Sequence, residues 1–195
     1  MDAPIRLLVG LGNPGREHDA TRHNAGFWFA DALAERLSCA FVSEGKFHGQ
    51  VARADDVRLL KPSTYMNLSG RSVAALLRFF GIATDEMLIV HDELDLRPGE
   101  IKLKFGGGLA GHNGLRDIDA QLGTAEFWRL RIGIGHPRDS LLPQQDVVDY
   151  VLRPPGTEER SAIRAAIDKG LDAWPAIAAG DFERAMMLLH TKETS

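Results

Sequence analysis

Two polar clusters in this sequence carry the residue types that general acid–base chemistry needs. The first runs from Thr21 to Gly26 and contains His23, between a predicted strand and a predicted helix. The second runs from Val90 to Asp95 and places Asp92 at the end of another apolar run. Active-site groups in open α/β sheets gather at the carboxyl ends of strands. If Asp92 approaches His23, it fixes the imidazole tautomer and raises its basicity, as proton abstraction from water requires.

Each cluster is also compatible with other interpretations. Taken alone, His23 fits a capping or surface histidine, and the acidic run fits a solvated turn. The residues His91, Asp92, Glu93 and Asp95 offer a third possibility, a site for a divalent metal. Strand alternation places Asp92 on the face opposite His91 and Glu93, which argues against the metal site.

Two further loops offer neutral amides and unusual backbone freedom. The loop from Pro62 to Gly70 contains Tyr65 and Asn67, and Asn67 by itself fits a turn or a helix cap. The loop from Gly106 to Gly114 has five glycines in nine residues, which indicates unusual backbone angles or the close approach of a ligand. Within it, Asn113 fits either a cap of the following helix or an amide presented to a substrate carbonyl.

A glycine pattern from Gly10 to Gly15 invites a nucleotide-binding interpretation. It matches G-x-G-x-x-G directly after a predicted strand. A dinucleotide loop opens at once into a helix and is followed, about 20 residues on, by an acid at the end of a second strand. Here a polar stretch follows the glycines, and Asp31 and Glu35 fall inside a predicted helix. The pattern is therefore weak support for a nucleotide cofactor.

The elements that must position these loops alternate between strands and helices. Apolar runs and alternation predict strands over residues 5–11, 41–43, 47–53, 57–61, 87–91, 101–105 and 128–135, the last three of them central. Helical spacing predicts helices over residues 25–37, 69–80, 114–122, 157–179 and 181–189. We expect Asn24 to cap the first helix and Pro175 to kink or break the last turn of the fourth. The fold class is α/β, a twisted mixed β-sheet flanked by helices in a single globular domain over residues 1–195, with C-terminal helices over 157–189.

Composition narrows the class of protein further. The chain is 44% hydrophobic and 26% charged, which is typical of a globular protein and excludes a disordered or collagenous one. The single cysteine, Cys39, excludes an internal disulfide and a CxxC zinc or redox motif, and favours a reducing, cytoplasmic setting. No signal sequence precedes the first strand, and no apolar run approaches the roughly 18–20 residues that cross a bilayer. We therefore expect no membrane partner.

The charge pattern favours a local polyanion site over a generally basic protein. The net charge is −4, yet residues 97–116 carry four basic residues against one acid, and residues 85–95 carry five acids and no base. The basic set includes Lys102 and Lys104, and Arg131 follows in the next predicted strand. A solvated surface with chance clustering is the alternative.

Taken together, the motifs resemble those of bacterial peptidyl-tRNA hydrolases. The matching blocks, in order, are Val9–Gly15, Thr21–Gly26, Met66–Gly70, His91–Asp95, Gly111–Gly114 and Arg131–Pro137. The resemblance runs from about Leu7 to Leu152. It implies hydrolysis of the ester that joins a peptide to the terminal ribose of a tRNA, which recycles tRNA from prematurely released chains. It also implies one α/β domain, a monomer that requires no protein partner, and no metal or other cofactor.

The resemblance also implies roles for individual residues. His23 would be the base that activates water, Asp92 the carboxylate that orients it, and Asn13 a residue that helps place both. The implied substrate-binding residues are His18, Tyr65, Asn67, His112 and Asn113 on the cleft, and Lys102, Lys104 and Arg131 on the acceptor-stem phosphates. Neutral amides suit an oxyanion in a partly dry cleft. Phosphate contacts fix register without reading sequence, as a substrate set of all tRNAs requires.

Four positions depart from the family pattern. His18 stands where the family commonly has tyrosine, and Leu109-Ala110 replaces a more usual His-Gly pair in the glycine-rich loop. Ser140 stands where a lysine can occur, and Arg138 is placed to compensate. Two rival functions stay open from the sequence: a nucleotide-dependent oxidoreductase, and an RNA-binding module that binds tRNA and leaves the ester intact.

Overall fold

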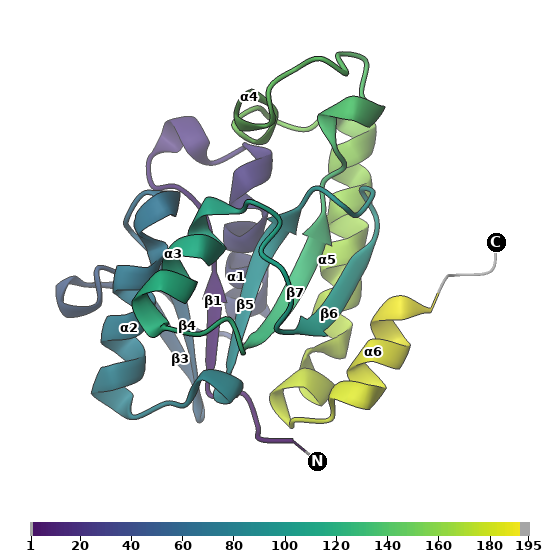
Figure 1. Ribbon diagram of the computed structural model, residues 1–195. Helices are drawn as coiled ribbons and strands as arrows, with labels where there is room; N and C mark the ends of the chain where they lie inside the picture. The colour runs from purple at the N-terminus through teal and green to yellow at the C-terminus, as the bar shows by residue number, and fades with distance from the viewer. Residues whose placement is uncertain (1, 192–195) are drawn as a thin grey trace.

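A seven-stranded mixed sheet forms the centre of the computed structural model, which describes residues 2–191 (Figure 1). The strands are β1 (Leu7–Gly10), β2 (Val42–Glu44), β3 (Gly49–Ala54), β4 (Val57–Pro62), β5 (Met87–Glu93), β6 (Ile101–Phe105) and β7 (Trp128–Gly133), in the order β2-β3-β4-β1-β5-β7-β6. The neighbours β4, β1, β5 and β7 are parallel, while β2, β3 and β6 join antiparallel at the two sides. The carboxyl ends of four strands therefore meet at one edge.

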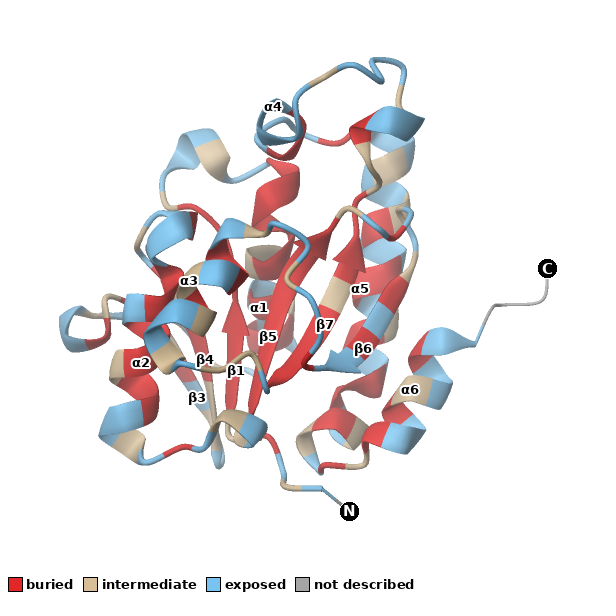
Figure 2. Cartoon of the chain, viewed as in Figure 1, coloured by how far each residue is buried: buried red, intermediate tan, exposed pale blue. Residues whose placement is uncertain are grey.

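Helices cover both faces of this sheet. They are α1 (Ala25–Arg36), α2 (Ser69–Phe80), α3 (Asn113–Leu122), α4 (Val147–Val151), α5 (Thr157–Ala178) and α6 (Phe182–His190). α2 and α3 pack on one face with their own apolar core, and α1, α5 and α6 pack on the other with a second core (Figure 1). Because both faces are covered, every residue of β1 and β5 is buried (Figure 2). The predicted α/β fold with a mixed sheet is confirmed.

Glycines let α1 lie directly on the strands that lead to the polar loops. A Cβ on Gly26 would lie 2.4 Å from the Val90 carbonyl oxygen and 2.5 Å from the Leu11 nitrogen. A Cβ on Gly10 would lie 2.4 Å from the Gly26 carbonyl oxygen, and one on Gly12 would meet the Phe27 ring at 2.6 Å. The glycines of the G-x-G-x-x-G pattern thus admit α1, and the space beside Gly10 and Gly12 is filled by protein. This packing counts against the nucleotide-loop interpretation and brings the start of α1 to the end of β5.

Two local predictions were wrong. β6 is an edge strand, because it pairs with β7 alone and runs antiparallel to it. Asn24 precedes α1, but its side chain makes no capping hydrogen bond. Of the two outcomes predicted for Pro175, a break is excluded, because α5 continues through it to Ala178, and a kink stays a prediction. Within residues 2–191, no helix combines the length and the apolar character needed to cross a membrane.

Candidate functional site

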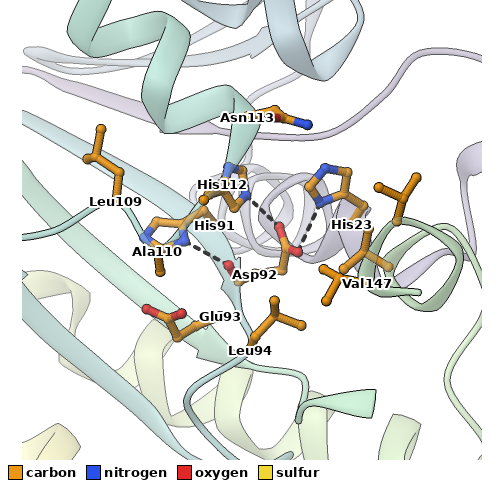
Figure 3. Close-up of a pocket in the computed structure, with 13 residues that line it drawn as sticks. His23, His91, Asp92, Glu93, Leu94, Leu109, Ala110, His112, Asn113 and Val147 are labelled. Carbon is orange, nitrogen blue, oxygen red and sulfur yellow. Dashed lines mark hydrogen bonds and ion pairs between the residues drawn. The ribbon is translucent and has the colours of Figure 1, made fainter. Parts of the chain in front are cut away.

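The two residues expected to form an acid–base pair meet at the carboxyl edge of the sheet. His23 lies on a single 3-10 turn, Arg22–Asn24, directly before α1, and Asp92 is the second-last residue of β5. Their side chains point toward each other, with 2.9 Å between His23 Nδ1 and Asp92 Oδ2 (Figure 3). Both residues are buried, and His23 lines a cleft beside them. Residues 69 positions apart therefore form one hydrogen-bonded pair.

A second histidine holds the other oxygen of the same carboxylate. His112 Nε2 lies 2.8 Å from Asp92 Oδ1 (Figure 3). His112 Nδ1 accepts hydrogen bonds from the backbone N–H groups of Gly114 and Leu115 at the start of α3, so the imidazole proton is on Nε2 and is donated to Asp92. His112, rather than Asn113, is therefore the residue that caps α3. Asp92 thus accepts one hydrogen bond on each oxygen, and His23 donates the second of them through Nδ1.

Burial and charge set the ionisation of this pair. Burial alone would raise the pKa of Asp92, but the neighbouring His23 and His112 and their hydrogen bonds outweigh burial and hold its pKa well below the usual range. Burial works against the charged form of His23, yet the charge of Asp92 and its hydrogen bond raise the pKa of His23 above 6.5. The carboxylate is therefore ionised, and the imidazole is strengthened as a base.

Asn13 is held by the buried side chain of Asn24, which was predicted to cap a helix. The Asn24 side chain accepts from the Asn13 backbone N–H at 2.8 Å and donates to the Asn13 carbonyl oxygen at 3.0 Å. The Asn13 side-chain oxygen accepts from the Met66 N–H at 2.7 Å. Since the oxygen of the Asn13 amide is used, its NH₂ group is the part left to donate to a ligand.

Of the other residues expected on the cleft, some line it and some lie outside. Asn113 and His112 line the cleft with His23 and Asp92. Tyr65 and Asn67 flank Met66 and are exposed. His18 is half-buried on the first loop beside Glu17 and does not line this cleft. The Nδ2 of Asn113 and the side chain of Asn67 are thus available to a substrate that extends along this edge.

Next to His23 the cleft is lined by apolar residues of α4, namely Val147, Val148 and Val151. Figure 3 shows Val147 beside His23. Leu94 and Leu109 also line the cleft, with Leu109 on the side away from Val147 (Figure 3). α4 is a five-residue helix that was not predicted from the sequence. A group that enters beside His23 therefore meets charged and amide groups on one side and aliphatic groups on the other.

The basic residues that were expected to contact phosphate lie on the neighbouring strands β6 and β7. Lys102 faces Arg131 across the β6–β7 pair, and Lys104 faces Arg129. Lys102 and Lys104 are exposed, whereas Leu103 between them is buried. Arg131 forms an ion pair with Glu93, with 2.7 Å between Nε and Oε1. Within residues 2–191 the two lysines form no ion pair, whereas part of the charge of Arg131 is neutralised by Glu93.

The alternation argument against a metal site at His91, Asp92 and Glu93 agrees with the geometry. Glu93 faces Arg131, and Asp92 faces His23. A different set, His23, Asp92 and His112, has ligand atoms within 4.8 Å of one another. Both oxygens of Asp92 are already used by the hydrogen bonds from His23 and His112, so an ion bound by this carboxylate would compete with those contacts.

Three residues near the site make contacts that the sequence did not predict. Asn24 clamps Asn13, Glu93 pairs with Arg131, and Arg22 binds backbone carbonyls at the end of α4. Each contact joins residues more than ten positions apart in the sequence, so local sequence patterns do not predict it. The sequence placed all three within the motif blocks Thr21–Gly26 and His91–Asp95, but it did not indicate these partners.

Comparison with known proteins shows the family of this chain. Residues 7–195 match the family model described as "Peptidyl-tRNA hydrolase". A peptidyl-tRNA hydrolase from Polynucleobacter asymbioticus is 58% identical over 96% of this chain and 98% of its own. One from Nitrosospira multiformis is 56% identical over 98% of this chain and 100% of its own.

Solved structures show the same similarity. The crystal structure of peptidyl-tRNA hydrolase from Acinetobacter baumannii is 47% identical with a TM-score of 0.88, and covers 95% of this chain and 94% of its own. An Arg119Gln mutant from Acinetobacter baumannii is 45% identical with a TM-score of 0.92, and covers 100% of this chain and 99% of its own. With nearly the whole chain matched in sequence and in fold, this protein belongs to the peptidyl-tRNA hydrolase family.

Proposed function

We propose that this chain hydrolyses the ester bond between a peptide and the 3′-terminal ribose of peptidyl-tRNA, with water activated by His23 and Asp92. The observation that carries the proposal is the 2.9 Å contact between His23 Nδ1 and Asp92 at the mouth of a cleft. Because Nδ1 donates to Asp92, Nε2 is the nitrogen left to accept a proton. Family membership supplies the substrate class.

The free Nε2 of His23 determines how the proposed reaction proceeds. His23 Nε2 takes a proton from a water molecule as the water oxygen attacks the acyl carbon, and the carbonyl electrons move to the oxygen. The ionised Asp92 stabilises the imidazolium that forms. When the tetrahedral intermediate collapses, the bond to the ribose oxygen breaks, and the imidazolium returns its proton to that oxygen. Water is the only co-reactant, and the base is regenerated.

Neutral amides are suited to hold the peptide and the oxyanion. We assign Asn13, Asn67 and Asn113 to this role because the three flank the cleft or the turn beside it and donate through NH₂ groups. An amide donor stabilises a developing oxyanion without adding a counter-charge to the histidine base. Tyr65 and His112 are assigned to the same side, and His18 to the outer part of the substrate.

Lys102, Lys104 and Arg131 are assigned to the acceptor-stem phosphates. The two lysines are exposed on one face of the edge strand, opposite Arg129 and Arg131 of β7. Phosphate contacts of this kind hold a nucleic acid without selecting its sequence. We further propose that residues 1–195 act as a single domain and a monomer in the cytoplasm, without a metal, another cofactor or a protein partner.

Release of labelled peptide from N-acetyl-aminoacyl-tRNA tests the proposal. Wild-type protein and His23→Ala are compared at matched tRNA occupancy, with and without EDTA. His23→Ala should lower kcat by about 10²–10⁴, the usual contribution of a general base, with little change in tRNA affinity. Activity that persists in EDTA supports a metal-free reaction, whereas loss in EDTA implicates the ion site at His23, Asp92 and His112.

The remaining alternative is an RNA-binding module with the same fold. In that case the wild type binds peptidyl-tRNA and leaves the ester intact, and His23→Ala changes nothing measurable. A loss of tRNA binding in His23→Ala that equals the loss of rate would remove His23 from the role of base.

A further inference from the structure

An arginine next to His23 reaches toward α4 and has no part in the reaction described above. Arg22 is buried, and its guanidinium carbon lies 3.9 Å from the centre of the Tyr150 ring. Its Nη1 donates to the backbone carbonyls of Tyr150 and Arg153, at 2.9 and 3.4 Å, and its Nη2 pairs with Glu159 at 3.0 Å. A single side chain therefore joins the turn that carries His23, the end of α4 and the start of α5.

α4 depends on such support because it is short. Its five residues are far fewer than the roughly 12–15 that an isolated helix needs in water. Val147 and Val148 are 36% and 54% exposed, so apolar burial does little for its first turn. At its N-terminus the Asp146 side chain accepts from the Val148 N–H at 3.1 Å. At its C-terminal end the Arg22 side chain adds donors and a positive charge to the Tyr150 and Arg153 carbonyls. Each of these oxygens also accepts one backbone N–H, from Arg153 at 3.3 Å and from Arg22 at 3.1 Å.

The position of α4 determines the shape of the cleft. Val147, Val148 and Val151 line it together with His23. Because Arg22 and His23 belong to the same three-residue turn, a contact from Arg22 to α4 fixes the valine wall relative to the base.

We propose that Arg22 is a positioning residue that holds α4, and with it the valine wall of the cleft, beside His23 for substrate binding. The inference rests on the proposed hydrolase function, since it assigns the wall to the substrate of that reaction. It places Arg22 in binding rather than in the chemical step, because the His23–Asp92 contact does not involve it.

Arg22→Met tests this, because methionine keeps apolar bulk and removes all the donors. We expect KM to rise about tenfold, the change that corresponds to loss of one charge-assisted hydrogen bond. We expect kcat to change by less than about threefold, and its pH dependence to stay the same, because the base is untouched. Hydrogen exchange at the Tyr150 N–H, which donates to the Asp146 carbonyl at 3.0 Å, should become faster.

Two further variants separate this effect from general destabilisation. Arg36→Met removes another arginine that pairs with a carboxylate of α5, Asp172 at 2.9 Å, and should leave KM and α4 exchange at wild-type values. Asp146→Ala loosens α4 from its other end and should raise KM in the same direction by a smaller factor. Asp146→Ala also keeps the proposal testable if Arg22→Met fails to fold.

Specific results would overturn the proposal. A lower kcat with a shifted apparent pKa in Arg22→Met would place Arg22 with the base, and unchanged KM together with unchanged α4 exchange would remove its role. Faster α4 exchange in Asp146→Ala with an unchanged KM would show that the wall does not bind substrate. If the wild type cleaves no peptidyl ester, the proposed function fails instead, while the exchange measurement still reports on the contact between Arg22 and α4.

Discussion

Replacement of Asp92 by asparagine tests most directly whether this carboxylate keeps His23 in the tautomer that can act as a base. The carboxylate accepts one hydrogen bond from His23 Nδ1 at 2.9 Å and another from His112 Nε2 at 2.8 Å. An asparagine side chain has one oxygen and one NH₂ group, so it can accept from only one of the two imidazoles. His112 must remain the donor, because its other nitrogen already accepts from the start of α3. The asparagine NH₂ group then faces His23 Nδ1.

That contact forces His23 into the tautomer that cannot act as a base. Nδ1 must accept from the new NH₂ group, so the proton moves to Nε2, the nitrogen that should receive the proton of water. The charge that raises the pKa of His23 is lost in the same step, while burial continues to favour the neutral form. We expect kcat to fall by about 10³–10⁴, the size of the effect when a tautomer-fixing carboxylate is replaced by an amide. KM should change little.

Single-turnover release of peptide from labelled N-acetyl-aminoacyl-tRNA measures the chemical step, and binding of deacylated tRNA measures affinity separately. Asp172→Asn is a matched control, since it makes the same substitution at an exposed ion pair between α5 and Arg36. A decrease of less than about tenfold in Asp92→Asn would refute the tautomer reasoning. A decrease carried by KM alone would show that Asp92 acts on binding.

Three further predictions concern pH, salt and packing. Because the pKa of His23 is raised above 6.5 and the base must be neutral, kcat should increase with pH through an apparent pKa above 6.5; a midpoint below that value in a pH–rate profile would contradict the assignment. Lys104→Ala should raise KM, and the slope of log KM against log salt concentration should fall by about one, because one phosphate contact is lost. An unchanged slope in a salt titration would show that Lys104 does not contact the tRNA phosphates. Gly26→Ala places a Cβ 2.4 Å from a strand carbonyl and should lower the free energy of unfolding by about 1–3 kcal/mol in a urea titration; a neutral result would mean that α1 can shift at no cost.

Local sequence determined most of the secondary structure. The helix predicted over residues 69–80 has those bounds, because its apolar spacing is regular and Gly81 ends it in the left-handed conformation, at φ 62°. The strand predicted over residues 101–105 likewise has those bounds, with buried and exposed residues alternating over residues 101–104. The position of β6 at the edge of the sheet was not predictable. Strand order depends on how the other strands pair, and the sequence of β6 itself does not encode it.

The sequence was enough to identify the family and to select His23, Asp92 and Asn13 as candidates for the chemistry, whereas only the folded chain shows how these residues are held. His23, Asp92 and Asn13 stand in motifs whose order identifies the family. That Asn24 binds the backbone of Asn13, and that Asp92 is shared between His23 and His112, required the folded chain. The physical reason is that a hydrogen bond between distant segments depends on where the backbone places both partners, and an asparagine or histidine has the same local propensity whether or not its partner arrives.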